Sequence, residues 1–232
     1  MEQQQAHTIP GAVAGLGVDS RARFIARTYV HLLGAMALFV LAEYFLFSTD
    51  AAATILNFAT RTSWLLILGG FMLVGWLATR AAHTSASKPV QYLALVGFVL
   101  AEAIIFAPLI HIIEGAAGGG VIGSAAAVTL VAFAALTGVV FITRKDFSFL
   151  GAILRWAGVV ALLLIVAGVV FGFQLGTFFS VGMVAFAGAA ILYDTSNILH
   201  HYPEDRYVGA ALELFASIAL LFWYVLRLFS RN

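Results

Sequence analysis

Long apolar stretches, separated by short polar segments, organise this chain. Seven stretches approach the roughly 20 residues that a helix needs to cross a bilayer. They cover residues 24–47, 64–82, 90–112, 120–142, 150–171, 177–200 and 207–229. The connections between them are too short to hold a soluble domain. The pattern therefore predicts an all-α, polytopic membrane protein, in which residues 21–232 form a seven-helix transmembrane domain behind a mobile N-terminal tail of residues 1–20.

Composition supports this class and excludes others. Hydrophobic residues make up 62% of the chain and charged residues only 10%, whereas soluble domains are about 25% charged. The chain has no cysteine, which excludes disulfides, thiol chemistry and cysteine-based metal sites. It has no basic surface pattern typical of nucleic-acid binding. The expected surroundings are therefore the lipid bilayer.

The distribution of Lys and Arg predicts the orientation. Basic residues concentrate before the first span and in every second connection, at Arg21, Arg23, Arg27, Arg80, Lys88, Arg144, Lys145 and Arg206. The opposite side has only Arg61, Arg227 and Arg231. Because positive charge stays on the cytoplasmic side, we expect a cytoplasmic N-terminus and, after seven spans, a C-terminus outside.

Two acids inside the apolar spans are predicted to face each other. Asp194 lies about six residues before the end of the sixth span, and Glu213 about six residues after the start of the seventh. The two helices run antiparallel, and at 1.5 Å per residue both acids sit roughly 9 Å deep. One interpretation is a pair that shares a proton and binds a divalent cation such as calcium. In a second, Glu213 reaches the surface and Asp194 caps a helix or pairs with an arginine. In a third, each acid has a different partner.

Glu102 is the deepest acid and lies near the middle of the third span. It either lines an ion path or forms hydrogen bonds as a protonated, structural group. The sequence lacks the motifs of metalloproteases, serine hydrolases and phosphate-binding loops. We therefore expect no enzyme activity and no cofactor beyond a candidate calcium ion.

Four segments resemble the Bax-inhibitor family of membrane proteins. They are "FIARTYVHLLGAMAL", "ITRKDFSFLGA", "AILYDTSNILHH" and "YVGAALELFASIALLFWYVLRLF". The pieces "TRKDFSFLG" and "ILYDTSNIL" look like the YccA branch. The resemblance implies a seven-helix bundle with the last helix at its centre. From some bacterial members it implies a pH-sensitive calcium leak that is gated by two aspartates on the sixth and seventh helices. From the YccA branch it implies restraint of the membrane-anchored AAA protease FtsH, which holds the protein by its cytoplasmic N-terminal tail.

The leak motif is transferred to this chain one residue at a time. The first family aspartate corresponds to Asp194, but the second corresponds to Ser217, which departs from the leak pattern. Glu213 lies one helical turn earlier on the same face and could replace the missing acid. The candidate for the arginine that partners the aspartate is Arg80, at the cytoplasmic end of the second span.

Three functions remain open from the sequence. The first is a bacterial inner-membrane regulator of FtsH whose Asp194–Glu213 pair senses pH. The alternative is a pH-sensitive calcium or cation leak channel, gated by that pair, with Glu102 and Ser217 on the ion path. The third is an interaction protein without transport activity.

Overall fold

The described part of the chain is helical throughout. The computed structural model describes residues 12–117 and 119–230. Its elements are η1 Val13–Gly15, α1 Val18–Ser48, α2 Ala51–Arg61, α3 Trp64–Thr84, α4 Lys88–Ala117, α5 Gly119–Thr143, α6 Leu150–Phe171, α7 Thr177–His200, η2 Glu204–Arg206 and α8 Tyr207–Phe229. Apart from one isolated bridge between Ala12 and Pro203, these residues form no strand. Within the described residues, seven helices are long and apolar enough to cross a membrane, which confirms the predicted fold class.

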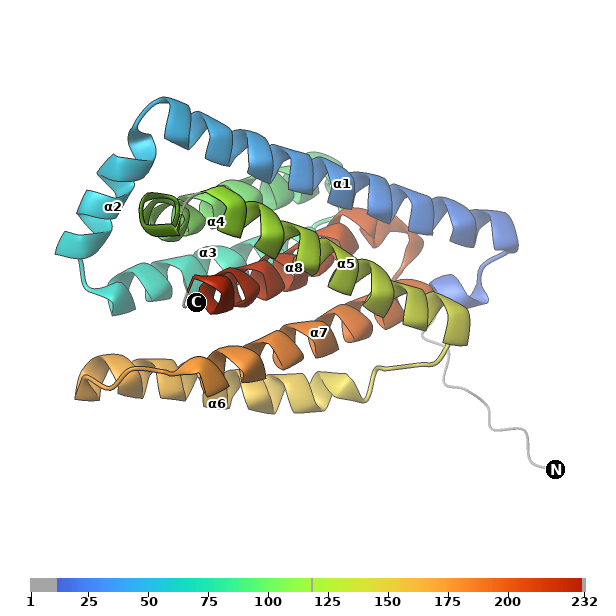
Figure 1. Cartoon of the computed structure of the whole chain (residues 1–232). Helices are drawn as coiled ribbons and strands as arrows, with labels where there is room; N and C mark the ends of the chain where they lie inside the picture. The colour runs from blue at the N-terminus through green and yellow to red at the C-terminus, as the bar shows by residue number, and fades with distance from the viewer. Residues whose placement is uncertain (1–11, 118, 231–232) are drawn as a thin grey trace.

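The short helix α2 is the one described α-helix that the pattern of spans did not predict. It occupies what the sequence suggested was a plain connection between the first two spans. With 11 residues it is too short to cross a bilayer, which takes about 20. It folds across one end of the bundle and packs on α4 (Figure 1).

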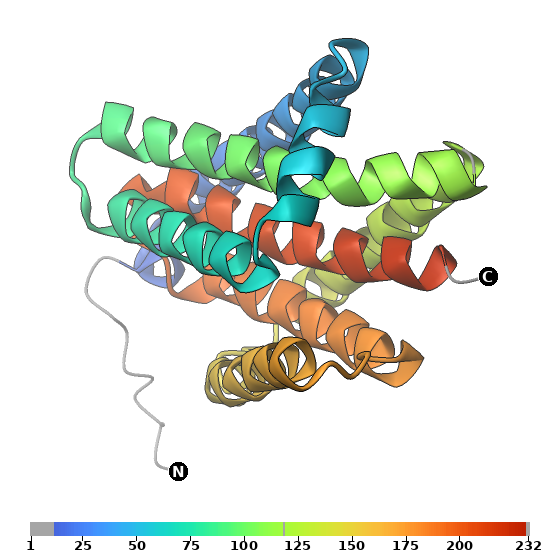
Figure 2. The ribbon, with the colours of Figure 1, turned by 90° about the vertical axis from the view of Figure 1, so that its left-hand side faces the viewer.

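Helix α8 lies at the centre of the bundle. It packs against α7, α1, α5, α4 and α3, and both ribbon views show it enclosed by other helices (Figures 1 and 2). In the most apolar 18-residue stretch of this span 72% of the residues are buried, whereas 6–44% are buried in the corresponding stretches of the other spans. The central position predicted for the seventh span is confirmed. Helix α6 is the outermost span, because it packs mainly on α7 and only slightly on α3.

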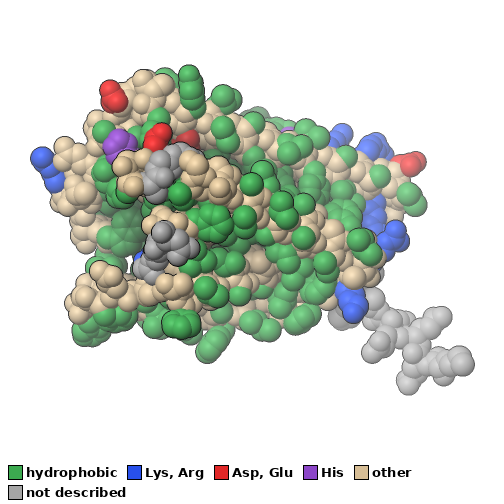
Figure 3. All heavy atoms as spheres, viewed as in Figure 1, with side chains coloured by type: hydrophobic (Ala, Val, Ile, Leu, Met, Phe, Trp, Pro, Cys, Tyr) green, Lys and Arg blue, Asp and Glu red, His purple; other side chains and the backbone are tan. Residues whose placement is uncertain are grey.

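The outer surface of the bundle suits a lipid environment. Large apolar side chains are widely exposed on the spans, including Phe178 at 95% and Ile142 at 84%. In the space-filling view they cover the middle of the molecule, and most of the visible Lys and Arg side chains gather at the end where the N-terminus lies (Figure 3). The protein is therefore a multi-pass membrane protein. That this basic end of the bundle faces the cytoplasm stays a prediction.

Part of the predicted mobile tail belongs to the folded bundle. Residues 1–11 lie outside the described part of the chain. From Ala12 onward the backbone packs under the α7–α8 connection, where Val13 is fully buried and its N–H donates to the carbonyl of Tyr202 at 2.9 Å. Helix α1 then begins at Val18. The expected boundary between the tail and the transmembrane domain at residue 20 is therefore wrong for residues 12–20. These residues pack with the bundle because the apolar side chain of Val13 is buried there.

A glycine allows α3 to approach α8 closely. A Cβ atom added at the buried Gly209 would lie 3.0 Å from the imidazole of His83 and 3.3 Å from the carbonyl oxygen of Ala82. Both distances are tighter than ordinary contact. Gly209 therefore sets the spacing of these two helices, as small residues do in membrane bundles.

We expect Gly209→Leu to lower the stability of the protein by about 1–3 kcal/mol, the usual cost of overpacking. The matched control is Gly34→Leu, because the space around a Cβ at Gly34 is open. Thermal unfolding in detergent micelles measures both. Equal melting temperatures for the two variants would contradict the role given to Gly209.

Candidate functional site

The buried end of the site is a hydrogen bond between α7 and α8. The hydroxyl of Ser217 donates to Oδ2 of Asp194 at 2.5 Å. Both residues are buried, at 8% and 6% exposed respectively. A carboxyl group in an apolar interior needs such a partner. Ser217 thus occupies the place where the resemblance expects a second acid, and it contacts the first one directly.

Glu213 lies one turn closer to the α7–α8 connection and has two other partners. Its Oε2 accepts a hydrogen bond from the hydroxyl of Tyr202 at 2.9 Å. Its Oε1 lies 2.7 Å from Nε2 of His83, an ion-pair distance, although the ring N–H is not aligned for a hydrogen bond. Glu213 remains 29% exposed.

The two acids of the predicted pair are therefore neighbours without a hydrogen bond between them among the described contacts. The charges of Glu213 and Asp194 are close enough to interact, yet within the described residues each carboxyl forms its hydrogen bond with a different side chain. The structure brings Asp194, Ser217 and Glu213 into one cluster between α7 and α8. Whether the two acids share a proton stays a prediction.

Tyr202 and His83 complete the cluster and were not among the predicted residues. Burial raises the pKa of Tyr202 well above its ordinary value, and the charges of Glu213 and Asp194 raise it further. The phenol therefore stays protonated and donates to Glu213. Tyr202 stacks on the ring of His83 at 5.7 Å between centroids. The only signal in the sequence was the position of both residues at helix ends on the side predicted to be cytoplasmic.

Arg80 and Glu102 lie elsewhere. Arg80 is exposed, and its guanidinium lies over the ring of Trp76, 5.5 Å from the centroid. The basic side chain at the acids is instead His83, less than a turn further along α3. Glu102 is 7% exposed and lines a separate cavity of about 710 Å³ that neither Asp194 nor Ser217 lines.

The α5–α6 connection forms a second polar cluster with the end of α7. Oδ1 of Asp146 accepts from the N–H of Ser148 at 2.8 Å and from the hydroxyl of Ser196 at 3.3 Å. Ser196 in turn accepts from the N–H of Phe147 at 2.8 Å, and Nε2 of His201 lies 3.0 Å from Oδ2 of Asp146. Two segments that carried the resemblance, "ITRKDFSFLGA" and "AILYDTSNILHH", therefore contact each other.

This second cluster depends on the charge of Asp146. Partial burial works against ionisation, but the hydrogen bonds from Ser148 and the nearby charge of His201 outweigh it and lower the pKa of Asp146. A carboxyl with a lowered pKa contributes stability at neutral pH, and this contribution is lost as the pH falls through that pKa. At neutral pH the ionised Asp146 therefore holds the α5–α6 connection against the end of α7.

A calcium ion at Asp194 and Glu213 remains a prediction. The described residues hold no group of three His, Cys, Asp or Glu side chains that could ligate a metal. Calcium takes about six to eight oxygen ligands. The carboxyls of Asp194 and Glu213 and the hydroxyl of Ser217 offer a minority of these, so water or backbone oxygens would have to complete the shell.

The fold and the cluster define a class: a seven-span helical membrane protein with an acid cluster between its sixth span and its central seventh. The family model described as "Inhibitor of apoptosis-promoting Bax1" matches residues 21–232, and the chain belongs to this family. The resemblance of the four segments is thereby confirmed.

Three relatives show how wide the family is. "Modulator of FtsH protease YccA" of Escherichia coli is 30% identical over 183 residues, which is 77% of this chain and 83% of the relative. "Uncharacterized protein PA2604" of Pseudomonas aeruginosa is 35% identical over 168 residues, or 71% of this chain and 72% of the relative. "Golgi anti-apoptotic protein" of Vaccinia virus is 27% identical over 229 residues, or 94% and 89%. One of these relatives is thus named as a protease modulator and another as an anti-apoptotic protein.

We expect Ser217→Ala to destabilise the protein by about 1–3 kcal/mol, because it leaves the buried Asp194 without its donor. Ser180→Ala is the matched control, since Ser180 is fully buried in α7 and its hydroxyl has no hydrogen-bond partner among the described residues. Thermal unfolding in micelles compares the two. If both variants melt together, the Ser217–Asp194 bond does not stabilise the bundle.

Proposed function

We propose that the protein is a bacterial inner-membrane regulator that engages a membrane-anchored AAA protease of the FtsH type through its N-terminal tail. The support from relatives is the modulator of FtsH in Escherichia coli and a second relative named "Inner membrane protein YccA". The protease would be the partner, and residues 1–11 would be the segment that it grips.

The observation that carries this proposal is the attachment of the N-terminal segment to the α7–α8 connection. Ala12 bridges to Pro203, and the N–H of Val13 donates to the carbonyl of Tyr202. The other end of Tyr202 donates to Glu213. A force on residues 1–11 therefore acts first on Tyr202, and through Tyr202 on the acid cluster.

The start of α1 reinforces the same connection. The guanidinium of Arg21 donates to the carbonyl of Leu199 at 3.1 Å. The ring of Phe24 stacks on that of Tyr202 at 6.3 Å between centroids. The N-terminal segment and the cluster thus form one contact unit, in which a partner on the tail and a proton on Glu213 would influence each other.

Removing residues 2–11 should slow degradation of the protein in cells and abolish co-purification with the host's FtsH-type protease, because the grip is lost while Ala12 and Val13 still close the bundle. The control is a full-length chain in which residues 2–11 keep their composition in shuffled order. Pulse-chase half-lives and affinity capture provide the two readouts. A truncated protein that is degraded and captured like the full chain rules the tail out as the handle.

A second function, a pH-sensitive calcium leak, is favoured by the acid cluster itself. Asp194 on α7 and Ser217 on the central helix α8 form a buried polar contact. Glu213 and His83 form the next polar contact along α8, closer to the α7–α8 connection. Groups of this kind gate ion paths by binding and releasing protons. A leak and protease regulation can coexist in one bundle.

We expect calcium entry into liposomes, followed from about pH 6 to about pH 8 on either side of neutrality, to depend on pH for the native protein. Asp194→Asn should make the flux independent of pH, while Glu102→Gln, in a separate cavity, should leave the profile unchanged. Ser217→Asp, which supplies the second acid of the leak pattern, should increase the flux. An absence of flux at every pH eliminates the channel and leaves the regulator.

A further inference from the structure

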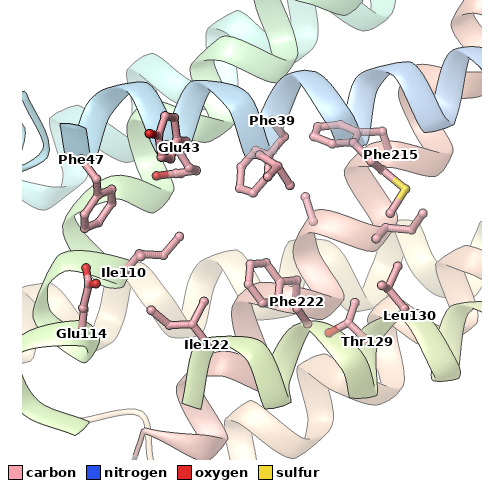
Figure 4. Close-up of a pocket in the computed structure, with 16 residues that line it drawn as sticks. Phe39, Glu43, Phe47, Ile110, Glu114, Ile122, Thr129, Leu130, Phe215 and Phe222 are labelled. Carbon is pink, nitrogen blue, oxygen red and sulfur yellow. The ribbon is translucent and has the colours of Figure 1, made fainter. Parts of the chain in front are cut away.

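A second cavity lies on the other side of α8 and takes no part in the functions above. It occupies about 450 Å³ between α1, α4, α5 and α8. Cavities of roughly 300–1,000 Å³ are the size that binds small molecules. Its walls are largely apolar and include the rings of Phe39, Phe47, Phe215 and Phe222 (Figure 4).

One buried acid in this cavity has no hydrogen-bond partner in the part of the chain that the structure describes. Glu43 on α1 is 8% exposed, and both oxygens of its carboxyl group are buried without a hydrogen-bond partner among the described residues. Figure 4 shows the side chain of Glu43 on α1 and that of Glu114 on α4, both at the cavity. A carboxyl group buried in this way is costly unless something outside the chain satisfies it.

The side chains that line the cavity favour a cationic ligand. Glu43 and Glu114 are its acidic lining residues, and no Lys, Arg or His is among the described residues that line it. The hydroxyl of Thr129, another lining residue, already donates to the carbonyl of Ala125 at 2.8 Å. A complementary ligand therefore carries a positive N–H donor for Glu43 and an apolar body for the aromatic walls, which also favour cations.

The cavity opens on the surface that faces lipid. Three of its lining residues are strongly exposed, with Val40 at 64%, Tyr44 at 74% and Leu130 at 45%. They belong to α1 and α5, which pack mainly on other helices rather than on each other. A ligand that partitions into the bilayer can thus enter between these two helices.

We propose that this cavity is a binding site for lipophilic amines, in which the protonated nitrogen of a primary or secondary amine donates to Glu43 and its compact hydrophobic body packs against Phe39, Phe215 and Phe222. Neither Asp194 nor the N-terminal segment lines this cavity, so the proposal does not rest on the protease or on the leak.

The test is equilibrium binding of radiolabelled 1-adamantylamine to the full-length protein in phosphatidylcholine nanodiscs, whose lipid has no N–H donor. Binding to empty nanodiscs is subtracted. We expect saturable binding that unlabelled amine displaces and that 1-adamantanol, of the same shape but without charge, does not. Equal displacement by the alcohol would show that the site selects shape alone, and would overturn the proposal.

Glu43→Gln should weaken binding by about 10- to 100-fold, the worth of a charge-assisted hydrogen bond. The variant should melt no lower than the native protein, because the acid that it removes has no partner to lose. Glu102→Gln is the matched control, since Glu102 is equally buried but lines the other cavity, and it should bind like the native protein. Unchanged binding in Glu43→Gln would refute the assignment.

Ala126→Phe tests the cavity without touching the acid. Ala126 is a lining residue on α5, and a phenyl ring there would fill the space that the ligand body needs. We expect saturable binding to be lost. Retention of full affinity by this variant would place the ligand elsewhere and would also reject the proposal, whatever the behaviour of Glu43→Gln.

Discussion

The structure depends on the enclosure of α8 by helices that lack a hydrophobic drive to associate. Inside a bilayer the lipid tails are as apolar as the side chains, so close packing and polar contacts must hold the helices together. Gly209 allows α3 to approach closely, and Ser217 fixes α7 through Asp194. Glu213 adds the contacts to Tyr202 and His83. The residues of chemical interest are therefore also the residues that hold the central helix in place.

Polar contacts are unevenly distributed along the bundle. At the end where the N-terminus lies, Val13 holds the α7–α8 connection and Asp146 holds the end of α7. Toward the opposite end, Glu43 is buried without a hydrogen-bond partner among the residues that the structure describes. One end is thus held by several polar contacts between segments, and the other contains a buried carboxyl group for which the described residues provide none. This asymmetry separates the regulatory contacts from the proposed ligand site.

The sequence predicted what apolar run length and loop length determine. It located the seven spans, because a span is a long apolar run, and it predicted that Asp194 and Glu213 are neighbours, because a short connection forces antiparallel helices. In the structure Asp194 contacts Ser217, one turn further along α8 than Glu213. The sequence did not identify His83, since choosing between His83 and Arg80 requires the rotation of α3 about its axis. The spacing of residues along one helix does not determine how that helix is rotated against its neighbours. The sequence also could not show that Val13 is buried, because the residues that cover Val13 belong to the distant α7–α8 connection.

Because α8 borders the acid cluster and both cavities, these three sites depend on its position. Its residues Glu213 and Ser217 belong to the acid cluster, Phe215 and Phe222 line the cavity of Glu43, and Ala219 lines both that cavity and the one that holds Glu102. A helix packed on most sides cannot shift without repacking its neighbours, since interiors are dense and resist small displacements. A pull on the N-terminal segment, a proton at the acid cluster and an amine beside Glu43 would therefore all bias the same element. Such shared dependence is the physical form that coupling between distant sites takes.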